Sequence, residues 1–301
     1  MDKRINKSEF SSEDNFLWNK KTIDVFRYYM QICKEYNLKW YCGCGTVIGA
    51  IRHKGMIPWD DDIDVCMPRE EYDKFIEICR KLESNDFELV TPDSDSSYNA
   101  FHARLMDKNS TILFWRRYPV VLGIYIDIFP MDGIGSDKKK AEEHYRKYLK
   151  NYFCFRECHA HFSLENIKYY LTHNQKKRAF SSILFSFNRK WFRDYYLRQI
   201  KKIAKTYSWN ESKYILTYSP GWGEKEIYLK EWVEETTLTE FEGMQVPVPA
   251  KYDEYLRYFY NDYMKLPPVE ERNQRHKIDY YNLNRRETFE EILQHIKEQG
   301  R

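Results

Sequence analysis

Residues 59–68 read WDDDIDVCMP, and this short acidic run decides the fold that we expect. Successive side chains of a β-strand point to opposite faces, so Asp60, Asp62 and Asp64 would share one face while the apolar residues between them meet a core. Three carboxylates on one face repel one another. A divalent cation such as Mg²⁺ or Mn²⁺ prefers carboxylate oxygens and would relieve that repulsion. The pattern therefore predicts a half-buried strand that carries metal ligands.

Two other interpretations of the acidic run were weighed. Most charge runs are solvated loops, but the apolar alternation and the flanking prolines argue against a loop here. A calcium-binding loop would also begin with spaced acidic residues. It requires glycine at its sixth position, where this chain has Val65, and Pro68 would interrupt it. We reject the calcium loop and retain the strand.

A glycine-containing turn, GCGT at residues 43–46, lies upstream between a predicted strand and a predicted helix. Such a turn presents backbone N–H groups, and at Thr46 a hydroxyl, to a phosphate. The basic residues that follow, Arg52, His53 and Lys54, either supply positive charge to that phosphate or form a solvated basic loop.

Downstream, the apolar stretch IYIDIF at residues 124–129 contains a single carboxylate, Asp127. A buried aspartate needs a partner, which is either a metal ion or a structural hydrogen-bond donor. The order of a phosphate-binding turn, an acidic strand and a third aspartate on another strand resembles the nucleotidyltransferase-fold superfamily.

The surrounding pattern predicts an α+β protein with a mixed sheet flanked by helices. We expect a nucleotidyltransferase-like core at residues 1–137, a helical aromatic and basic annex at 138–213, and a segment at 214–301 that returns to the core. Helices are predicted at 15–36, 69–82, 252–260 and 286–297, and strands at 40–44, 59–67, 87–90, 103–106, 110–114 and 122–129.

Composition narrows the class of protein. The net charge of +3 over 301 residues argues against a nucleic-acid partner. No secretory leader or membrane-spanning run is visible, and the seven cysteines are scattered and odd in number, so we expect reduced thiols and a cytoplasmic location.

Two features of the annex stay open. Residues 168–207 are basic and aromatic; we favour packing of these aromatics on the core, and peripheral contact with the inner face of a membrane is the alternative. Cys154, Cys158 and His161 have helical spacing that suggests a zinc site, but structural zinc usually draws ligands from two separate elements, so we favour ordinary helix packing.

Three blocks of this sequence resemble the LicD family, which is related to fukutin and fukutin-related protein. They read GTVIGAIRHKGMIPWDDDIDVCMPREEYDKF at 45–75, IYIDIFPMDG at 124–133, and PVPAKYDEYLRYFYNDYMKLPP at 247–268, followed by Arg272 and His276. The chain departs from the family pattern at Cys42 and Cys44, and at Tyr260-Asn261, where an aromatic-glycine pair is usual.

The resemblance implies a phosphotransferase that moves an alcohol phosphate, most simply phosphocholine from CDP-choline, to a sugar hydroxyl of a surface glycan such as lipopolysaccharide or teichoic acid. The implied partners are a CDP-alcohol donor and a sugar or lipid-linked glycan acceptor, with CMP as product and Mg²⁺ or Mn²⁺ as cofactor.

The implied metal ligands are Asp60, Asp62, Asp64 and Asp127, and the implied catalytic residues are Asp62, Asp64 and Asp127, with Asp127 also able to accept the hydroxyl proton. The implied donor contacts are Gly45, Thr46, Arg52, His53 and Lys54, and Arg104 and His276 are weaker candidates.

Two alternatives remain at this point. A nucleotidyltransferase would leave the nucleotide on the acceptor and release diphosphate. A non-catalytic protein with the same fold would bind a glycan or a membrane without turnover.

Overall fold

The computed structural model describes residues 4–160, 162–218, 221–272 and 276–298. Its centre is a seven-stranded mixed sheet in which β2 and β7 are parallel and the other paired strands are antiparallel. Five strands follow the order β1 (Tyr41–Cys42), β2 (Asp64–Pro68), β7 (Tyr125–Gly133), β4 (Ala103–Asp107) and β3 (Phe87–Val90). Strands β8 (Tyr214–Leu216) and β9 (Tyr228–Leu229) extend it from the end of β7. The predicted α+β class with a mixed sheet is confirmed.

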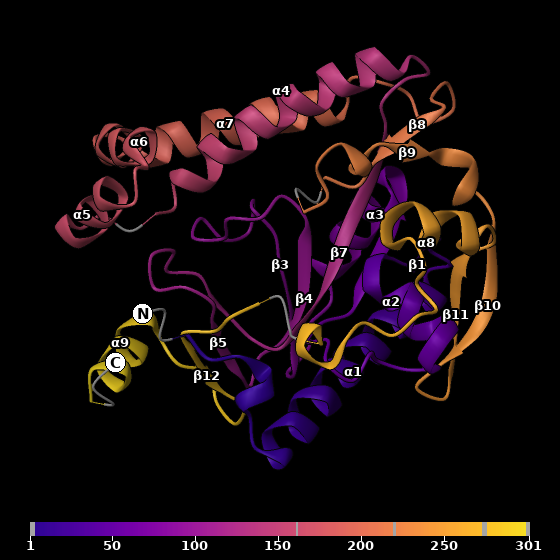
Figure 1. The fold of residues 1–301 in the computed structure, drawn as a ribbon, viewed down its shortest axis with the longest axis horizontal. Coiled ribbons are helices and arrows are strands. Elements are labelled where there is room, and N and C mark those ends of the chain that lie inside the picture. Colours follow the sequence, from indigo (N-terminus) through magenta and orange to yellow (C-terminus); the bar gives the residue numbers. More distant parts are fainter. Residues whose placement is uncertain (1–3, 161, 219–220, 273–275, 299–301) are drawn as a thin grey trace.

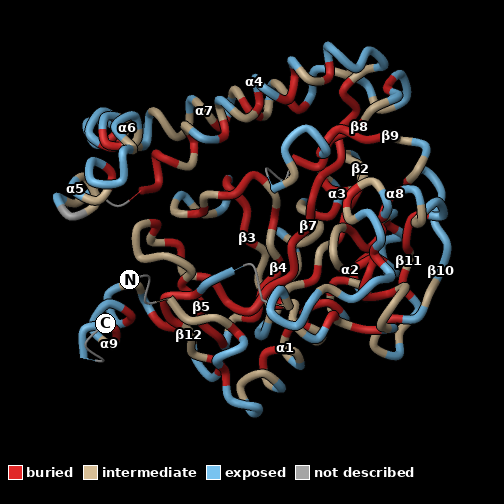
Figure 2. The backbone as a smooth tube through the Cα atoms, in the orientation of Figure 1, coloured by how far each residue is buried: buried red, intermediate tan, exposed pale blue. Residues whose placement is uncertain are grey.

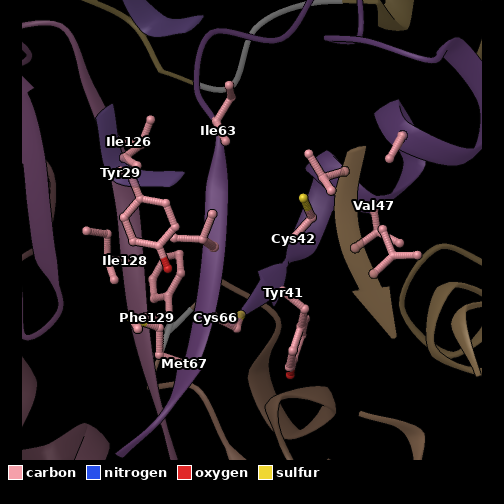
Figure 3. Close-up of a cluster of buried hydrophobic side chains, with 14 of the residues drawn as sticks. Tyr29, Tyr41, Cys42, Val47, Ile63, Cys66, Met67, Ile126, Ile128 and Phe129 are labelled. Atoms are coloured by element: carbon pink, nitrogen blue, oxygen red, sulfur yellow. The ribbon is translucent and has the colours of Figure 1, made fainter. Parts of the chain in front are cut away.

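Helices α1 (Ser12–Glu35) and α3 (Arg69–Cys79) pack on this sheet, close to their predicted ranges. The apolar residues of α1 recur at helical spacing, and Tyr29 from this stripe meets Phe75 of α3 with ring centroids 5.1 Å apart. Figure 3 shows part of this buried cluster, with Tyr29 of α1 and apolar side chains of β2 and β7 such as Met67 and Ile128. Burial of this face fixes which side of the sheet remains for polar side chains.

The acidic run was predicted as a strand over residues 59–67, but β2 begins only at Asp64. Residues 60–63 lie before the first ladder pair with β7. The Ile63 carbonyl still accepts from the Asp127 N–H at 2.9 Å, but side chains bond to the carbonyls of Asp60 and Asp61. Lys7 Nζ donates to the Asp60 carbonyl at 2.7 Å, and Trp18 Nε1 donates to the Asp61 carbonyl at 2.8 Å. The predicted alternation nevertheless survives in this loop, since Asp61 and Ile63 are buried and Asp60 and Asp62 are half-buried.

The strand predicted at residues 122–129 is two strands, β6 (Val121–Leu122) and β7. Gly123 separates them. A Cβ atom on Gly123 would lie 1.9 Å from the Asp107 carbonyl oxygen, so only glycine permits the close approach that turns the chain between two sheets.

The remaining elements flank this core. β5 (Thr111–Leu113), β6 and β12 (Tyr280–Asn282) form a three-stranded sheet, and β10 (Thr236–Phe241) and β11 (Met244–Pro249) form a hairpin. The other helices outside the annex are α2 (Cys44–Ile48), its π-helical continuation η2 (Gly49–His53), α8 (Tyr252–Tyr260) and α9 (Phe289–Glu298). Short 3₁₀ turns are η1 (Lys7–Glu9), η3 (Gly223–Glu226), η4 (Lys230–Trp232) and η5 (Val269–Glu271).

The predicted helical annex is present as α4 (Lys138–Glu157), α5 (Leu164–Thr172), α6 (Lys176–Ser186) and α7 (Arg189–Ala204). The two long helices α4 and α7 lie side by side, and α5 and α6 lie at their far end (Figure 1). Tyr148 of α4 is buried and donates to the Tyr218 carbonyl, which ties the annex to the chain that follows β8. Within the predicted stretch 168–207, Tyr170 and Phe185 are buried whereas Phe180, Phe187 and Trp191 are exposed, so packing of its aromatics is confirmed only in part. The division of the chain at residues 137 and 213 stays a prediction.

The suggested zinc site stays untested, because one of its three residues is outside the described part of the chain. Among the described residues, Cys154, Cys158 and His159 do not join a cluster of three metal-ligating groups, and the His159 Nδ1–H group donates instead to the Phe155 carbonyl at 2.8 Å. His161 lies outside the described residues. All seven cysteines are free.

Two buried histidines of the annex predict acid sensitivity. Burial lowers the pKa of His144 and of His159 to about 4, against about 6.5 in an unfolded chain. The unfolded chain therefore takes up these protons first, and the free energy of unfolding should fall between pH 6.5 and pH 4 by up to about 3 kcal/mol per histidine. Thermal unfolding should be measured at several pH values. The melting temperature of His159→Gln should fall less steeply with decreasing pH than that of the unchanged protein. The exposed His173→Gln variant is the control, and an unchanged slope in His159→Gln would contradict the expectation.

Candidate active site

The site is built on three adjacent strands. In the parallel pair β2–β7, Asp64 lies opposite Asp127, and in the antiparallel pair β7–β4, Arg104 lies opposite Asp127. Residues directly opposite one another on neighbouring strands place their side chains on the same face. The sheet therefore presents a row of carboxylate, carboxylate and guanidinium groups on the face opposite the α1–α3 core.

Asp62, from the loop before β2, joins this row. Carboxylate oxygens of Asp62, Asp64 and Asp127 all lie within 4.8 Å of one another, which is close enough to hold one cation. A second group of three, Asp61, Asp62 and His276, adjoins the first through Asp62. Asp60 lines the same cavity, but among the described residues it does not join either group. The structure thus brings together three of the four predicted ligands.

The electrostatics of these carboxylates indicate which ion the site fits. Burial, together with the repulsion of neighbouring aspartates, raises the pKa of Asp62 and of Asp64 well above the usual range. Burial and the charge of Asp61 likewise raise the pKa of Asp60 to about 6. Ionised oxygens held this close are stabilised by a hard divalent cation, so the residues fit Mg²⁺ or Mn²⁺.

Asp127 differs from the other carboxylates of the cluster. Its Oδ1 atom accepts from Arg104 Nε at 2.5 Å and from His102 Nε2 at 2.8 Å. Burial favours the neutral acid, but the charge of Arg104 and the bonds from His102 and Arg104 outweigh it and hold the pKa of Asp127 well below its usual range. A carboxylate held ionised in this way is a good ligand and a poor proton acceptor, which argues against the predicted role of Asp127 as a base.

The turn at residues 43–46, predicted to bind phosphate, mainly positions neighbouring groups of the site. Gly45 lines the cavity, and a Cβ atom there would lie 3.0 Å from Asp60 Oδ2, so glycine leaves room for that carboxylate. Thr46 is buried and is not among the cavity-lining residues; its Oγ1 atom accepts the Asp64 N–H at 2.8 Å. Thr46 therefore holds the start of β2, and the predicted contact of its hydroxyl with phosphate finds no support in this geometry.

The three basic residues that were predicted to contact the donor, Arg52, His53 and Lys54, lie in different surroundings. Arg52 lines the cavity and donates to the Tyr263 carbonyl, and its Nε–H points to His53 Nε2 at 2.9 Å. His53 packs edge-on against Trp59 outside the cavity lining. Lys54 is exposed and its Nζ lies 3.4 Å from Thr239 Oγ1 of β10, so the structure does not bring it to the site. Of the three, only Arg52 lines the space next to the carboxylates.

The cavity over this row has a volume of about 870 Å³, within the range of small-molecule sites of roughly 300–1,000 Å³. Its other walls come from residues 221–222 and 260–271. A second cavity of about 940 Å³ lies at the opposite ends of β2 and β7, beside Arg69 and Asp132. It contains none of the predicted site residues.

Sequence reasoning missed His102 and gave Arg104 and His276 only as weaker candidates, yet the fold brings all three to the cavity. His102 lies just before β4 and Arg104 lies on it, and the period-two spacing of this His-x-Arg pair was a signal that both side chains face Asp127. His276 lies far along the chain, yet its Nδ1 is 3.2 Å from Asp61 Oδ2. Burial alone would lower the pKa of His276, but the hydrogen bond to Asp61 and the charge of that carboxylate raise it to about 9. No local pattern indicates this contact.

A mixed sheet that carries aspartates on adjacent strands below a cavity defines a nucleotidyltransferase-like fold. Residues 37–170 match the family described as LicD/FKTN/FKRP, nucleotidyltransferase domain. The lipopolysaccharide cholinephosphotransferase LicD of Haemophilus influenzae is 32% identical over 269 residues, covering 87% of this chain and 95% of that protein. The chain belongs to the LicD family.

Shorter similarities connect the chain to two uncharacterized proteins. One, from Rickettsia typhi, is 38% identical over 59 residues, which are 20% of this chain and 19% of that protein. The other, from Rickettsia prowazekii, is 39% identical over 41 residues, which are 14% and 15% of the two chains.

The departure noted at Tyr260-Asn261 also has a structural account, since Asn261 ends α8 with a φ of +56°, a conformation that glycine adopts most readily and asparagine tolerates.

Proposed function

We propose that this protein transfers phosphocholine from CDP-choline to a sugar hydroxyl of a cell-surface glycan and releases CMP. The observation that carries the proposal is the cluster of Asp62, Asp64 and Asp127 at the floor of a ligand-sized cavity. The similarity to a lipopolysaccharide cholinephosphotransferase along nearly its whole length supports both the choline group and the glycan acceptor. The seven free cysteines suit a reducing cytoplasm, where we place the reaction.

The cavity walls support a choline-bearing donor. Trp222 and Tyr260 meet edge to face with ring centroids 4.9 Å apart, and Trp59 lines the same space. The carboxylates of Asp262 and Glu271 also line it. Quaternary ammonium groups bind over aromatic faces and near negative charge. These walls suit choline better than they suit an uncharged polyol such as ribitol.

The carboxylate cluster suits the diphosphate of such a donor. When bound, Mg²⁺ or Mn²⁺ would neutralise the charge of the diphosphate and orient it. Asp62, Asp64 and Asp127 would hold that cation, and Arg104 and His102 keep Asp127 ionised and in place. Arg52 lines the cavity and can meet a phosphate oxygen. In the transfer, the acceptor hydroxyl oxygen bonds to the choline-bearing phosphorus, the bond from that phosphorus to the CMP oxygen breaks, and the hydroxyl proton is released.

The test is product analysis with a panel of CDP-alcohols, Mg²⁺ and candidate glycans. We expect CMP release and glycan-bound phosphocholine with CDP-choline, and little turnover with CDP-ribitol. Release of diphosphate with transfer of a nucleotide would instead identify a nucleotidyltransferase. Failure to bind Mg²⁺ and every CDP-alcohol would favour a non-catalytic binding protein.

A further inference from the structure

Large apolar side chains are exposed mainly at one place on this molecule. Among the described residues, ten of the seventeen exposed large hydrophobic side chains lie between positions 153 and 195, within the annex. They are Phe153, Phe162, Leu164, Leu171, Phe180, Ile183, Leu184, Phe187, Trp191 and Tyr195. In Figure 2 many residues of α5 and α6, at the far end of the annex, are coloured as exposed. Scattered exposed apolar residues are ordinary, but a contiguous group marks an interaction surface.

Helix α6 shows the arrangement most clearly. The exposed residues Phe180, Ile183, Leu184 and Phe187, here called the α6 face, follow the i, i+3, i+4, i+7 spacing that normally turns toward a protein core. Phe180 is 66% exposed and Phe187 is 83% exposed. The opposite side of the same helix is the buried one, and it consists of Ala179, Ser182 and Phe185. The annex thus packs on the less apolar side of α6 and leaves the apolar face uncovered.

Positive charge surrounds the α6 face. Residues 164–193 contain seven lysines and arginines against one glutamate. Lys176 and Lys177 are exposed in the first turn of α6 and, at 100° per residue, lie on the same side as Phe180. On α5, exposed Lys168 lies between Leu164 and Leu171 at helical spacing.

We propose that the tip of the annex, formed by α5, α6 and the start of α7, is a docking surface for an anionic lipid bilayer. The apolar side chains of the α6 face would enter the headgroup region while the lysines meet lipid phosphates, as in helices that lie in the membrane plane. Within the described residues, no helix has the length and apolar character needed to cross a membrane, so the contact is peripheral. A second copy of the chain fits less well, because a symmetric pairing would set the basic surface against itself. The proposal does not rest on the proposed reaction, since vesicle binding needs no donor.

The test is flotation of the full chain with vesicles of phosphatidylcholine, with and without about one third phosphatidylglycerol. We expect binding to the anionic vesicles that weakens as salt is raised. The double variant Phe180→Ser/Phe187→Ser should lower the vesicle-bound to free ratio at least about tenfold. Lys176→Glu/Lys177→Glu should do the same, because each basic residue near an anionic surface contributes about a fivefold factor. All four positions are exposed, so thermal unfolding should stay unchanged.

Two matched control variants test whether vesicle binding depends on this surface or on overall charge and exposed apolar side chains elsewhere. Lys138→Glu/Lys139→Glu makes the same charge change in the first turn of α4, and Phe16→Ser removes a phenylalanine that is 70% exposed on α1. Both should bind vesicles like the unchanged protein. Equal losses in the controls, equal binding to neutral vesicles, or no binding at all would overturn the proposal. Sedimentation showing a dimer that Phe180→Ser/Phe187→Ser dissociates, without vesicle binding, would assign the surface to a second copy instead.

Discussion

Replacing Asp64 by asparagine should lower the rate of the proposed phosphocholine transfer by about 10²- to 10³-fold, the usual cost of removing one group that stabilises charge in a transition state. Asparagine keeps the shape of the side chain and its place in the row opposite Asp127, but it removes one negative charge. The variant should therefore lose affinity for Mn²⁺, measured by paramagnetic resonance or calorimetry, as well as transfer activity. Its fold should persist.

Stability offers an independent check on the same variant. In metal-free buffer the carboxylates repel one another, and burial together with repulsion from Asp62 raises the pKa of Asp64. Asp64→Asn should consequently melt at an equal or higher temperature than the unchanged protein in EDTA, while Mg²⁺ should no longer raise its melting temperature. The exposed Asp86→Asn variant is the matched control and should behave like the unchanged protein. Full transfer activity in Asp64→Asn would show that the cluster is not the metal site.

The second large effect concerns the pair between Arg104 and Asp127. Asp127 is only 5% exposed, and Arg104 bonds to both of its oxygens. Replacing Arg104 by methionine should lower the free energy of unfolding by about 3–5 kcal/mol, because the substitution leaves a buried charge without its main partner. Urea unfolding in EDTA measures this effect without a contribution from bound cation.

A double variant distinguishes loss of the pair from loss of packing. Adding Asp127→Asn to Arg104→Met removes the stranded charge, so the double variant should recover much of the stability that the single variant loses. If the two substitutions add without recovery, the cost lies in packing of Arg104 against the Tyr125 ring, whose centroid is 4.0 Å from the guanidinium carbon. Both variants should lose transfer activity, since the ion pair positions a ligand of the cluster.

The local sequence predicted helices α1, α3 and α8 to within a few residues, because each buries a stripe of apolar side chains at helical spacing. The prediction from local sequence failed where residues alternate like a strand but lack a neighbouring strand to pair with. Residues 60–63 alternate like a strand, but the side chains of Lys7 and Trp18 satisfy the carbonyls of Asp60 and Asp61 in place of a neighbouring strand. Hydrogen-bond partners from distant parts of the chain decided where β2 begins.

The sequence by itself determined which groups make up the candidate site: an acidic run whose alternate residues face away from the core, and one aspartate in an apolar strand. Period-two burial is a local property, so it can be read from neighbouring residues. Only the tertiary structure decided which groups meet. The register of β4 against β7 places Arg104 on Asp127, and the path of the C-terminal segment brings His276 to Asp61. The same folding turns Lys54 toward β10 and leaves the α6 face uncovered. These contacts join segments far apart in the chain and depend on the summed packing of the whole core, which no short window of sequence contains.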